Sequence, residues 1–381
     1  MRPIRFSFTP PGEWPERKGP TGLSKSAFHE TMKILFIDPE CPAPLDGSDL
    51  GRVAIGGTES SLFRLAESLA AKGHWVAISQ HNRFGEKTEA NGVCYQGFVY
   101  RDRCPAADQP DVVVVLRNFK ILPRVRQQYP NARLCLWMHC FPGSRWSKAG
   151  SVIRQTDTTI ISVSKTLEEE MKKVLEKQIP AWQADCHTTT IYNPVNVHHP
   201  ETSLTWNPHQ LIYLSSPHKG LEEVLAKFRV LRIQFPHLTL ALANPGYLLE
   251  KERSHEEGIR ILGALPQEEL HRHVAQSLAV FYPQTTFAET FGLIFAEANS
   301  LGTPVLAHDL GAAKEVLNKG GKGQVQDCHN PNIISKTLIE WMEGNLPQVS
   351  SSPDFQLPTI TEKWENLFDS RAVTDTRSLV A

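Results

Sequence analysis

The chain has 381 residues, more than one hydrophobic core usually supports, so two domains are expected. Its hydrophobic and charged fractions of 40% and 21% are ordinary for a globular protein and exclude a disordered or fibrous class. The formal net charge of −1 argues against a nucleic-acid-binding protein, which would need a basic face to neutralise phosphates.

The sequence shows no membrane span and no secretory signal. Its longest apolar runs, such as VVVVL at 112–116, are far shorter than the roughly 20 residues that cross a bilayer. Residues 1–30 are rich in Pro, Gly and charge, and we expect them to be a disordered extension. The seven cysteines have no CxxC spacing, which argues against a disulfide framework. Together these features predict a cytoplasmic protein.

In the first half of the chain, short apolar runs alternate with helical patterns. The runs at 32–38, 74–79, 111–116, 132–138 and 158–164 predict buried strands. Helices are expected at 56–73, where an apolar stripe ends at a glycine, and at 164–178. Such alternation is typical of a parallel sheet with right-handed crossovers, so residues 31–193 are predicted to form one doubly wound α/β domain.

A second series of elements begins after residues 194–209, which are rich in Pro, Asn and His and are expected to be a linker. Strands are expected at 211–215, 238–243, 259–263, 277–283 and 303–308, and helices at 219–235, from 266, at 292–301 and at 311–318. Residues 210–352 therefore form a second doubly wound domain. Residues 353–381 carry a last amphipathic helix (359–370) and a tail. We expect the binding site between the domains, outside the carboxyl ends of their strands.

The first candidate site is AIGGTES at 54–60, where two glycines open a helix. At Gly56 and Gly57 backbone N–H groups can approach an anion, at the positive end of the helix. The alternative is a tight turn in which Thr58 or Glu59 caps the helix. The chain has neither GxGxxG nor GxxxxGK[ST], so dinucleotide-binding and P-loop chemistry are not indicated.

Lys219 and His139 each follow a predicted strand. Lys219 begins the helix of LSSPHKGLEEVL, where a cation opposes the helix dipole unless an anion such as a phosphate faces it. The alternative is a solvated lysine that pairs with Glu222 or Glu223. His139 reaches the carboxyl end of its strand, where active-site groups lie in such sheets, although a core histidine is equally compatible. Zinc binding by His139 with neighbouring cysteines is disfavoured, because Cys135 continues an apolar strand pattern typical of a buried thiol.

Glu289 and Glu297 lie together in FAETFGLIFAEANSLGTPVLA. Glu297 falls inside a predicted helix among apolar neighbours, where an unpaired carboxylate is costly and sugar or ribose hydroxyls would satisfy it. Gly292, near the start of that helix, would expose the N–H groups of Leu293 and Ile294 to a phosphate. The alternatives are two solvated surface charges or an acid/base pair of the glycosidase kind. Both glutamates come from one segment, whereas a glycosidase pair flanks its substrate from opposite walls of a cleft.

The order of these motifs resembles that of GT-B retaining glycosyltransferases of family four. A Gly-Gly-x-Glu loop precedes a histidine after a mid-domain strand, the Asn-Pro linker IYNPVN, a Lys-Gly pair, and a Glu-x7-Glu segment with Phe-Gly inside it. The likeness covers residues 32–370. It implies a GT-B fold of two Rossmann-like domains, the first on the acceptor side and the second binding the nucleotide sugar, with the C-terminal helix crossing back onto the first domain. It also implies transfer of a sugar from a UDP- or GDP-sugar to a hydroxyl acceptor, with retention at the anomeric carbon and without a metal or other cofactor.

The resemblance also implies how the donor phosphates are bound. Gly56 and Gly57 would face the diphosphate, and Lys219 would bind it and support the leaving group as charge develops. The family usually has an arginine a few residues before this lysine, whereas this chain reads YLSSPHKG. The phosphates would then be held by Lys219, the hydroxyls of Ser215 and Ser216, and backbone N–H groups.

The remaining roles concern the sugar and the ribose. The resemblance implies that Glu297 accepts hydrogen bonds from the ribose hydroxyls and that Glu289 holds hydroxyls of the transferred sugar, with His139 near it. Phe291, Gly292 and Leu293 would complete the pocket. His139, Lys219 and Glu289 are therefore the expected catalytic residues. The donor phosphate would assist deprotonation of the acceptor in a same-face attack.

Three rival hypotheses stay open. A GT-B nucleotide-sugar epimerase would share the motifs, and a non-catalytic sugar-nucleotide or glycan-binding protein would explain the missing arginine. The basic segment 117–133 is compatible with peripheral membrane contact or with a solvated helix face. Its cations are Arg117, Lys120, Arg124, Arg126 and Arg133. The acceptor is expected to dock on loops 39–55 and 139–150.

Overall fold

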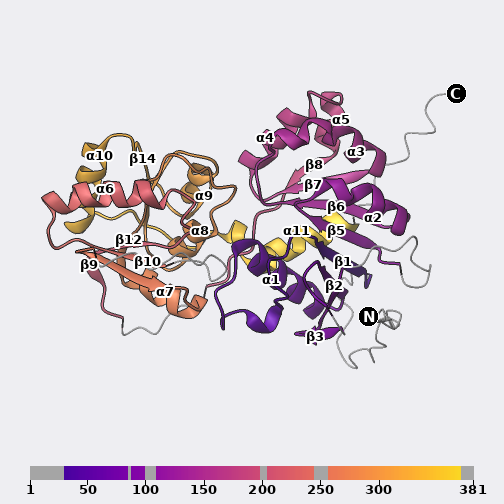
Figure 1. Cartoon of the computed structure of the whole chain (residues 1–381), viewed down its shortest axis with the longest axis horizontal. Helices are drawn as coiled ribbons and strands as arrows, with labels where there is room; N and C mark the ends of the chain where they lie inside the picture. Colours follow the sequence, from indigo (N-terminus) through magenta and orange to yellow (C-terminus); the bar gives the residue numbers. More distant parts are fainter. Residues whose placement is uncertain (1–29, 85–86, 99–108, 198–203, 244–255, 370–381) are drawn as a thin grey trace, which may run out of the picture.

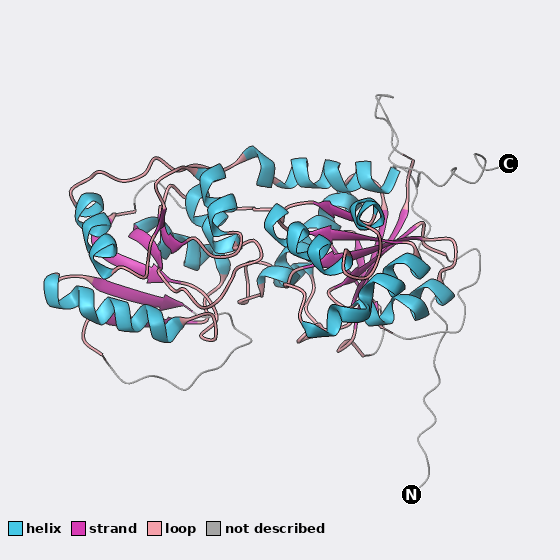
Figure 2. Cartoon of the chain, turned by 90° about the horizontal axis from the view of Figure 1, so that it is seen from above, coloured by secondary structure: helices cyan, strands magenta, loops and turns pink. Residues whose placement is uncertain are grey.

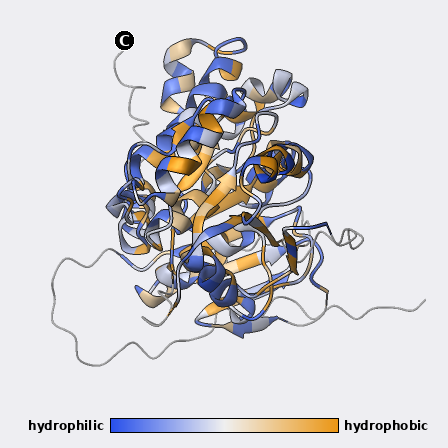
Figure 3. Cartoon of the chain, turned by 90° about the vertical axis from the view of Figure 1, so that its left-hand side faces the viewer, coloured by the Kyte–Doolittle hydropathy of each residue, from blue (hydrophilic) through white to orange (hydrophobic). Residues whose placement is uncertain are grey.

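The computed structural model describes residues 30–84, 87–98, 109–197, 204–243 and 256–369. They form two lobes, each built on one β-sheet, which lie side by side in Figure 1 and again in the view from above in Figure 2. Apolar residues concentrate on strands in the interior (Figure 3), as expected for parallel sheets covered by helices. Residues 1–29 of the expected extension (1–30) and the end of the tail (370–381) lie outside the described residues.

The first lobe contains an eight-stranded sheet among the described residues, in the order β3-β4-β2-β1-β5-β6-β7-β8. Its strands are β1 (Lys33–Asp38), β2 (Trp75–Gln80), β3 (Thr88–Ala90), β4 (Val93–Gly97), β5 (Val112–Leu116), β6 (Arg133–Met138), β7 (Thr158–Ser162) and β8 (Thr188–Thr190). All neighbours pair in parallel except β3 with β4. The strand order reverses between β1 and β5, the position at which such sheets bind ligands.

The helices of this lobe are α1 (Gly57–Ala71), α2 (Leu122–Gln128), α3 (Ala149–Thr156), α4 (Lys165–Leu175) and α5 (Ala181–Cys186). The five expected strands are present within a few residues of their predicted ends. The hairpin β3–β4 was not predicted, and the expectation of a purely parallel sheet is wrong at this edge. In β4, buried Val93 and Tyr95 alternate with less buried neighbours, a weaker signal than a continuous apolar run.

The second lobe contains a six-stranded parallel sheet among the described residues, in the order β11-β10-β9-β12-β13-β14. Its strands are β9 (Asn207–Tyr213), β10 (Thr239–Ala243), β11 (Ile259–Gly263), β12 (Ser277–Tyr282), β13 (Val305–His308) and β14 (Val325–Gln326). Its helices are α6 (Leu221–Gln234), α7 (Gln267–Gln276), α8 (Leu293–Ser300), α9 (Ala313–Gly320) and α10 (Pro331–Met342). Here the strand order reverses between β9 and β12, which places the loops after these two strands side by side.

The last helix, α11 (Leu357–Asp369), packs on the first lobe although it follows the second in the chain (Figure 1, yellow). Its Thr361 donates a hydrogen bond of 2.8 Å to Ser68 of α1. The ring of Trp364 lies 4.9 Å from that of Trp137 in β6. The two segments that join the lobes also contact each other, because the Val195 N–H donates to the Phe355 carbonyl at 2.8 Å.

Candidate active site

A cavity of about 790 Å³ lies between the two lobes. Its walls include residues from the loops after β1, β5 and β6 of the first sheet and after β9 and β12 of the second. This is the expected location, outside the carboxyl ends of both sets of strands. Every residue proposed from the sequence as part of the site lines this cavity: Gly56, Gly57, His139, Ser215, Ser216, Lys219, Glu289, Phe291, Gly292, Leu293 and Glu297.

The glycine loop forms part of the first wall. Helix α1 begins at Gly57 with Gly56 as its N-cap, so Thr58 lies inside the helix and is not its cap. The Glu59 carboxylate hydrogen-bonds to the N–H group of its own residue in the first turn, as the capping alternative expects of a glutamate there. A Cβ atom at Gly57 would lie 2.9 Å from the Leu293 side chain of the other lobe. The absence of a side chain therefore lets the two walls approach each other at this point.

The start of α8 forms the facing part of the second wall. Gly292 has φ of 78°, a left-handed conformation, and a Cβ there would lie 2.4 Å from the ring of Phe295. Glycine is therefore required for the chain to enter the helix at this angle. The first N–H groups of the helix, at Leu293 and Ile294, lie in the cavity wall and have no partner within the helix by its geometry.

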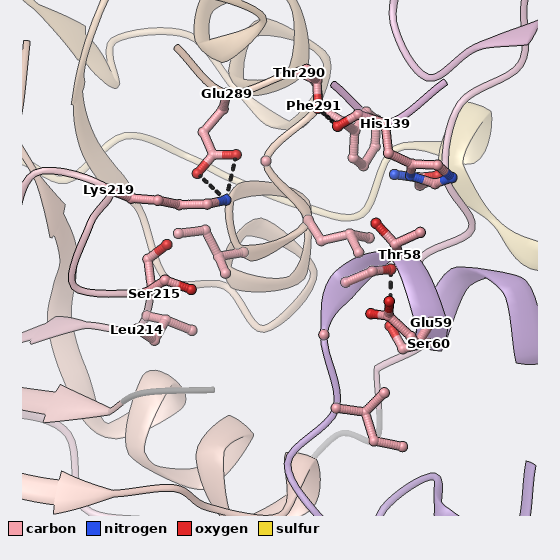
Figure 4. A pocket seen from close by; sticks show the side chains of 18 of the residues that line it. Thr58, Glu59, Ser60, His139, Leu214, Ser215, Lys219, Glu289, Thr290 and Phe291 are labelled. Atoms are coloured by element: carbon pink, nitrogen blue, oxygen red, sulfur yellow. Dashed lines mark hydrogen bonds and ion pairs between the residues drawn. The ribbon is translucent and has the colours of Figure 1, made fainter. Parts of the chain in front are cut away.

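Lys219 and Glu289 form an ion pair inside the second lobe, and they point toward each other in Figure 4. The Lys219 Nζ donates to both Glu289 oxygens, at 2.9 and 3.0 Å. It also lies 5.0 Å from the ring centroid of Phe287, a cation–π contact. The alternative pairing of the lysine with a glutamate on its own helix is wrong, because Glu223 instead accepts hydrogen bonds from Lys227 and Thr285. Helix α6 begins at Leu221, so Lys219 precedes the helix and does not start it.

A buried tyrosine donates a hydrogen bond to Glu289. The Tyr282 hydroxyl donates to Glu289 Oε1 at 2.8 Å, and its ring stacks on Tyr213 with the centroids 5.7 Å apart. Burial and the neighbouring Glu289 charge raise the pKa of Tyr282 far above its usual value. The tyrosine therefore stays protonated and acts as a fixed hydrogen-bond donor. The sequence analysis did not identify Tyr282, which lies in the apolar run of β12.

Glu297 has partners on another helix and in the other lobe. Its Oε1 accepts a 2.8 Å hydrogen bond from Gln267 Nε2 of α7, and the Arg64 guanidinium of α1 lies 3.9 Å away. Arg64 also donates to the Gln267 side chain. Burial raises the pKa of Glu297, while Arg64 and the Gln267 hydrogen bond act in the opposite direction. Sequence reasoning did not identify these two partners, because they come from segments far from Glu297 in the chain.

Both glutamates are buried, with exposed fractions of 6% for Glu289 and 7% for Glu297, so the surface-charge alternative is wrong. They have separate partners: one has a lysine and a tyrosine, the other an amide and an arginine. Their shared segment therefore presents two hydrogen-bond acceptors to the cavity, each fixed in a different way.

The first wall carries a charge cluster at the switch point of its sheet. Arg117, the residue after β5, donates to Asp38 at the end of β1 at 2.7 Å and lies 3.6 Å from Glu59 of α1. Its φ of 62° is unusual for a residue with a side chain. Burial raises the pKa of Glu59, and the nearby Arg117 opposes that shift. Two carboxylates thus surround one guanidinium at this end of the cavity.

This cluster changes the interpretation of the basic segment 117–133. Arg117 faces the cavity, and Arg126 donates to the carbonyl oxygens of Ala132 and Thr156. These two cations are therefore engaged within the lobe and do not belong to a solvated helix face or a membrane-facing surface. No helix in the described ranges is long and apolar enough to cross a bilayer.

His139 lies between the two walls (Figure 4). Its ring is 4.6 Å from that of Trp137, and its backbone carbonyl accepts a 3.0 Å hydrogen bond from Thr290 of the second lobe. Burial, and secondarily the charge of Arg117, lowers the pKa of His139 well below its usual value, so the imidazole is neutral at neutral pH. Within the described ranges its Nε2 is buried and has no hydrogen-bond partner. The histidine is half-buried and lines the cavity, so it belongs to the cavity wall and not to the core, which was the alternative.

Other residues weighed from the sequence lie away from this chemistry. Cys135 is fully buried, as expected for a core thiol, and burial raises its pKa to about 11. His271 is only 1% exposed, because α7 packs against β9 and β12. In the part of the chain that is described, no group of three or more His, Cys, Asp or Glu side chains could hold a metal ion.

Comparison with known proteins finds a sequence-family model that the second lobe matches. Residues 211–352 match the family model of glycosyl transferases group 1. A phosphatidyl-myo-inositol mannosyltransferase of Propionibacterium freudenreichii is 36% identical over 125 residues, which is 32% of this chain and 31% of the relative. A lipopolysaccharide 1,2-N-acetylglucosaminetransferase of Salmonella typhimurium is 24% identical over 276 residues, 66% of this chain and 69% of the relative. The chain thus matches about a third of the length of the mannosyltransferase.

Solved structures resemble the whole architecture. HepE of Anabaena, in complex with UDP and glucose, has a TM-score of 0.62 at 15% identity, with 89% of this chain and 100% of that chain covered. Sucrose-phosphate synthase of Thermosynechococcus elongatus has a TM-score of 0.60 at 14% identity, with 88% and 98% covered. These likenesses and the two facing Rossmann-like domains show that the chain has the GT-B fold. The predicted fold class is confirmed.

Proposed function

We propose that the protein is a glycosyltransferase that moves a sugar from a nucleotide-sugar donor to a hydroxyl acceptor. The observation that carries this proposal is the arrangement on the second wall, where Lys219, Glu289, Glu297 and the start of α8 surround one cavity. This wall lies within residues 211–352, the segment that matches the glycosyl transferases group 1 model. Two curated relatives of the chain have transferase names.

The donor diphosphate would lie between Lys219 and the N-terminus of α8. The lysine supplies a cation, and the helix supplies unpaired N–H groups and the positive end of its dipole. Leu214 lines the cavity in the region where the family pattern has an arginine. Ser215 and Ser216 are its neighbours in the wall, so neutral donors would replace part of the missing charge. Lys219 would then carry most of the stabilisation of the departing phosphate.

The two glutamates would hold the donor on either side of the diphosphate. Glu289 would accept hydrogen bonds from the transferred sugar, with its orientation fixed by Tyr282 and its charge balanced by Lys219. Glu297 would accept hydrogen bonds from the ribose hydroxyls, with Gln267 beside it. Lys219 would bind the donor phosphate and would also remain close to Glu289, so that its one positive charge stabilises both the phosphate and the carboxylate. UDP is the first nucleotide to test, since the structurally similar HepE was solved with UDP.

The acceptor would bind against the first wall, near His139 and the Arg117 cluster. A neutral imidazole can donate or accept a hydrogen bond, which suits a sugar hydroxyl. Transfer would proceed with retention, by attack from the face that the leaving group occupies, with a donor phosphate oxygen accepting the proton of the acceptor hydroxyl. No metal is required in this scheme, because Lys219 and helix N–H groups balance the diphosphate charge.

Binding and hydrolysis assays test this function. UDP or GDP should raise the melting temperature, and one sugar nucleotide of a panel should be hydrolysed slowly with release of the diphosphate, in EDTA as well as in Mg²⁺. If neither diphosphate shifts the melting temperature, the proposal fails. Binding without hydrolysis or transfer would instead identify a non-catalytic protein, and sugar isomerisation without an acceptor would identify an epimerase. The anomeric configuration of a product, read by NMR, tests retention.

A further inference from the structure

Arg64 is a buried cation that crosses from one lobe to the other. It lies on α1 of the first lobe with a side-chain exposed fraction of 6%, and it does not line the cavity. Its guanidinium donates to Gln267 of α7 and lies 3.9 Å from Glu297 of α8, both in the second lobe. Its Nη1 is buried and has no hydrogen-bond partner in the described part of the chain. The charge of Arg64 is therefore close to Glu297 Oε1, although Arg64 itself does not line the cavity.

The surroundings of Glu297 contain few charges. Arg64 is the cation that acts on it, Gln267 is its neutral hydrogen-bond donor, and the neighbours on its own helix are apolar. On α1, Glu67 also acts on Arg64, but Glu67 has its own hydrogen bond from Asn91. A carboxylate this buried is costly to keep charged without a nearby cation. Removal of Arg64 would leave Glu297 with one amide and no positive charge.

This arrangement exists only while the lobes are apposed, because the arginine and the glutamate belong to different sheets. Two other contacts hold the same apposition. Thr290 donates to the His139 carbonyl, and Glu315 of α9 accepts hydrogen bonds from the first N–H groups of α4, at Lys165 and Thr166. The first lobe therefore acts on Glu297 of the second lobe through Arg64, which does not itself line the cavity.

We propose that Arg64 is a positioning residue that holds Glu297 ready for the ribose hydroxyls, so that nucleotide affinity depends on the apposition of the two lobes. This inference rests on the proposed function, in which Glu297 binds the ribose. Its chemistry is specific. Two vicinal hydroxyls donate best to a charged carboxylate, whereas a protonated carboxyl loses part of its acceptor capacity. Arg64 supplies the charge that keeps the carboxylate in the accepting form.

The test compares Arg64→Met and Arg64→Lys with wild type and with Arg272→Met, a control at an exposed arginine on α7. Calorimetry with UDP and with GDP gives Kd from pH 5.5 to 8.5, and circular dichroism checks the fold. We expect Arg64→Met to weaken binding about tenfold at neutral pH, because the ribose hydroxyls would then donate to a buried carboxyl group that has lost its neighbouring cation. Arg64→Lys, which retains the charge, should recover part of the affinity, and Arg272→Met should bind as wild type does.

The pH dependence separates positioning from a loss of packing. Without Arg64 the pKa of Glu297 rises further, so binding by Arg64→Met should fall as the pH drops through a range in which wild type still binds. A Kd for Arg64→Met that equals that of wild type at every pH, while Glu297→Ala abolishes binding, would overturn the inference and leave the proposed function intact. If Arg64→Met does not fold, Arg64→Gln takes its place, because it removes the charge and keeps a polar side chain; a wild-type Kd and pH profile for Arg64→Gln would then overturn the inference. Wild type that binds neither UDP nor GDP would overturn the proposed function and this inference with it.

Discussion

Glu289 and Glu297 come from one short segment, but they are held in different ways. Glu289 is held within the second lobe, by Lys219 from the loop after β9 and by Tyr282 of β12. Glu297 is held by Gln267 of its own lobe and by Arg64 of the other. The difference teaches that the contacts of Glu289 are complete within the second domain, whereas those of Glu297 need both domains. Substitutions at the two positions should therefore respond differently to changes at the interface.

The largest expected effect is at Lys219. Lys219→Met would remove the cation of the proposed phosphate site and leave Glu289 with Tyr282 as its remaining donor. We expect transfer or donor hydrolysis to fall by a factor on the order of 100 to 1,000, as for loss of one group that stabilises developing charge. Initial rates at saturating donor measure this, with Lys336→Met as the control at an exposed lysine on α10. A rate near that of wild type would exclude Lys219 from the reaction.

The isosteric pair Glu289→Gln and Glu297→Gln tests the comparison directly. Each change removes a charge and keeps the size, and each should cost about 1.5–3 kcal/mol of hydrogen bonding to the donor, or roughly tenfold to hundredfold. Glu289→Gln should lower kcat, because the sugar is then misaligned for reaction. Glu297→Gln should raise the KM for the donor, because it acts on the ribose. Equal changes in both constants for both variants would remove the distinction between the two glutamates.

Tyr282→Phe should have a smaller effect, confined to the Glu289 side. The tyrosine donates to Glu289 and remains protonated at all ordinary pH values, so its loss removes one neutral hydrogen bond without changing the charge. We expect about 1 kcal/mol, a roughly fivefold decrease in kcat/KM, with UDP affinity unchanged. Parallel kinetics and calorimetry measure both. A loss of UDP affinity equal to the loss of kcat/KM would place the tyrosine in nucleotide binding instead.

The smallest effect on the site should come from Glu315→Ala, which changes the interface outside the cavity. Glu315 accepts hydrogen bonds from the Lys165 and Thr166 N–H groups, the Thr166 hydroxyl and the Tyr192 hydroxyl. Loss of this cap should reduce the free energy of unfolding by about 1–2 kcal/mol, measured by denaturant titration. A slight rise in the Kd for UDP, with kcat unchanged, would support dependence of Glu297 on the interface. An increase in the stability of the variant would contradict the capping role.

The sequence was sufficient to predict residues that line the cavity, but it did not predict the side chains that form ion pairs and hydrogen bonds with them. Continuous apolar runs mark the parallel strands, and residues just after such strands gather at one edge of a sheet, so Lys219, His139 and Glu289 could be placed. Arg64 and Arg117 were not recognised as partners of carboxylates. Arg64 is one polar position on an amphipathic helix, and Arg117 was grouped with its neighbours in the chain as a basic segment. Their true partners are set by packing between distant segments, which no local pattern records.

The contact between the two connecting segments has a mechanical consequence. The chain passes between the lobes once before β9 and once before α11, and the two passages are hydrogen-bonded at Val195 and Phe355. Two domains that are joined by two connecting segments held together at one place can rotate about that place more easily than they can slide past each other or separate. We therefore expect Val195 and Phe355 to lie near the pivot of such a movement, which would change the width of the cavity between the lobes. A disulfide between cysteines introduced on the facing walls, tested oxidised and reduced, would stop this swing and show how much nucleotide entry depends on it.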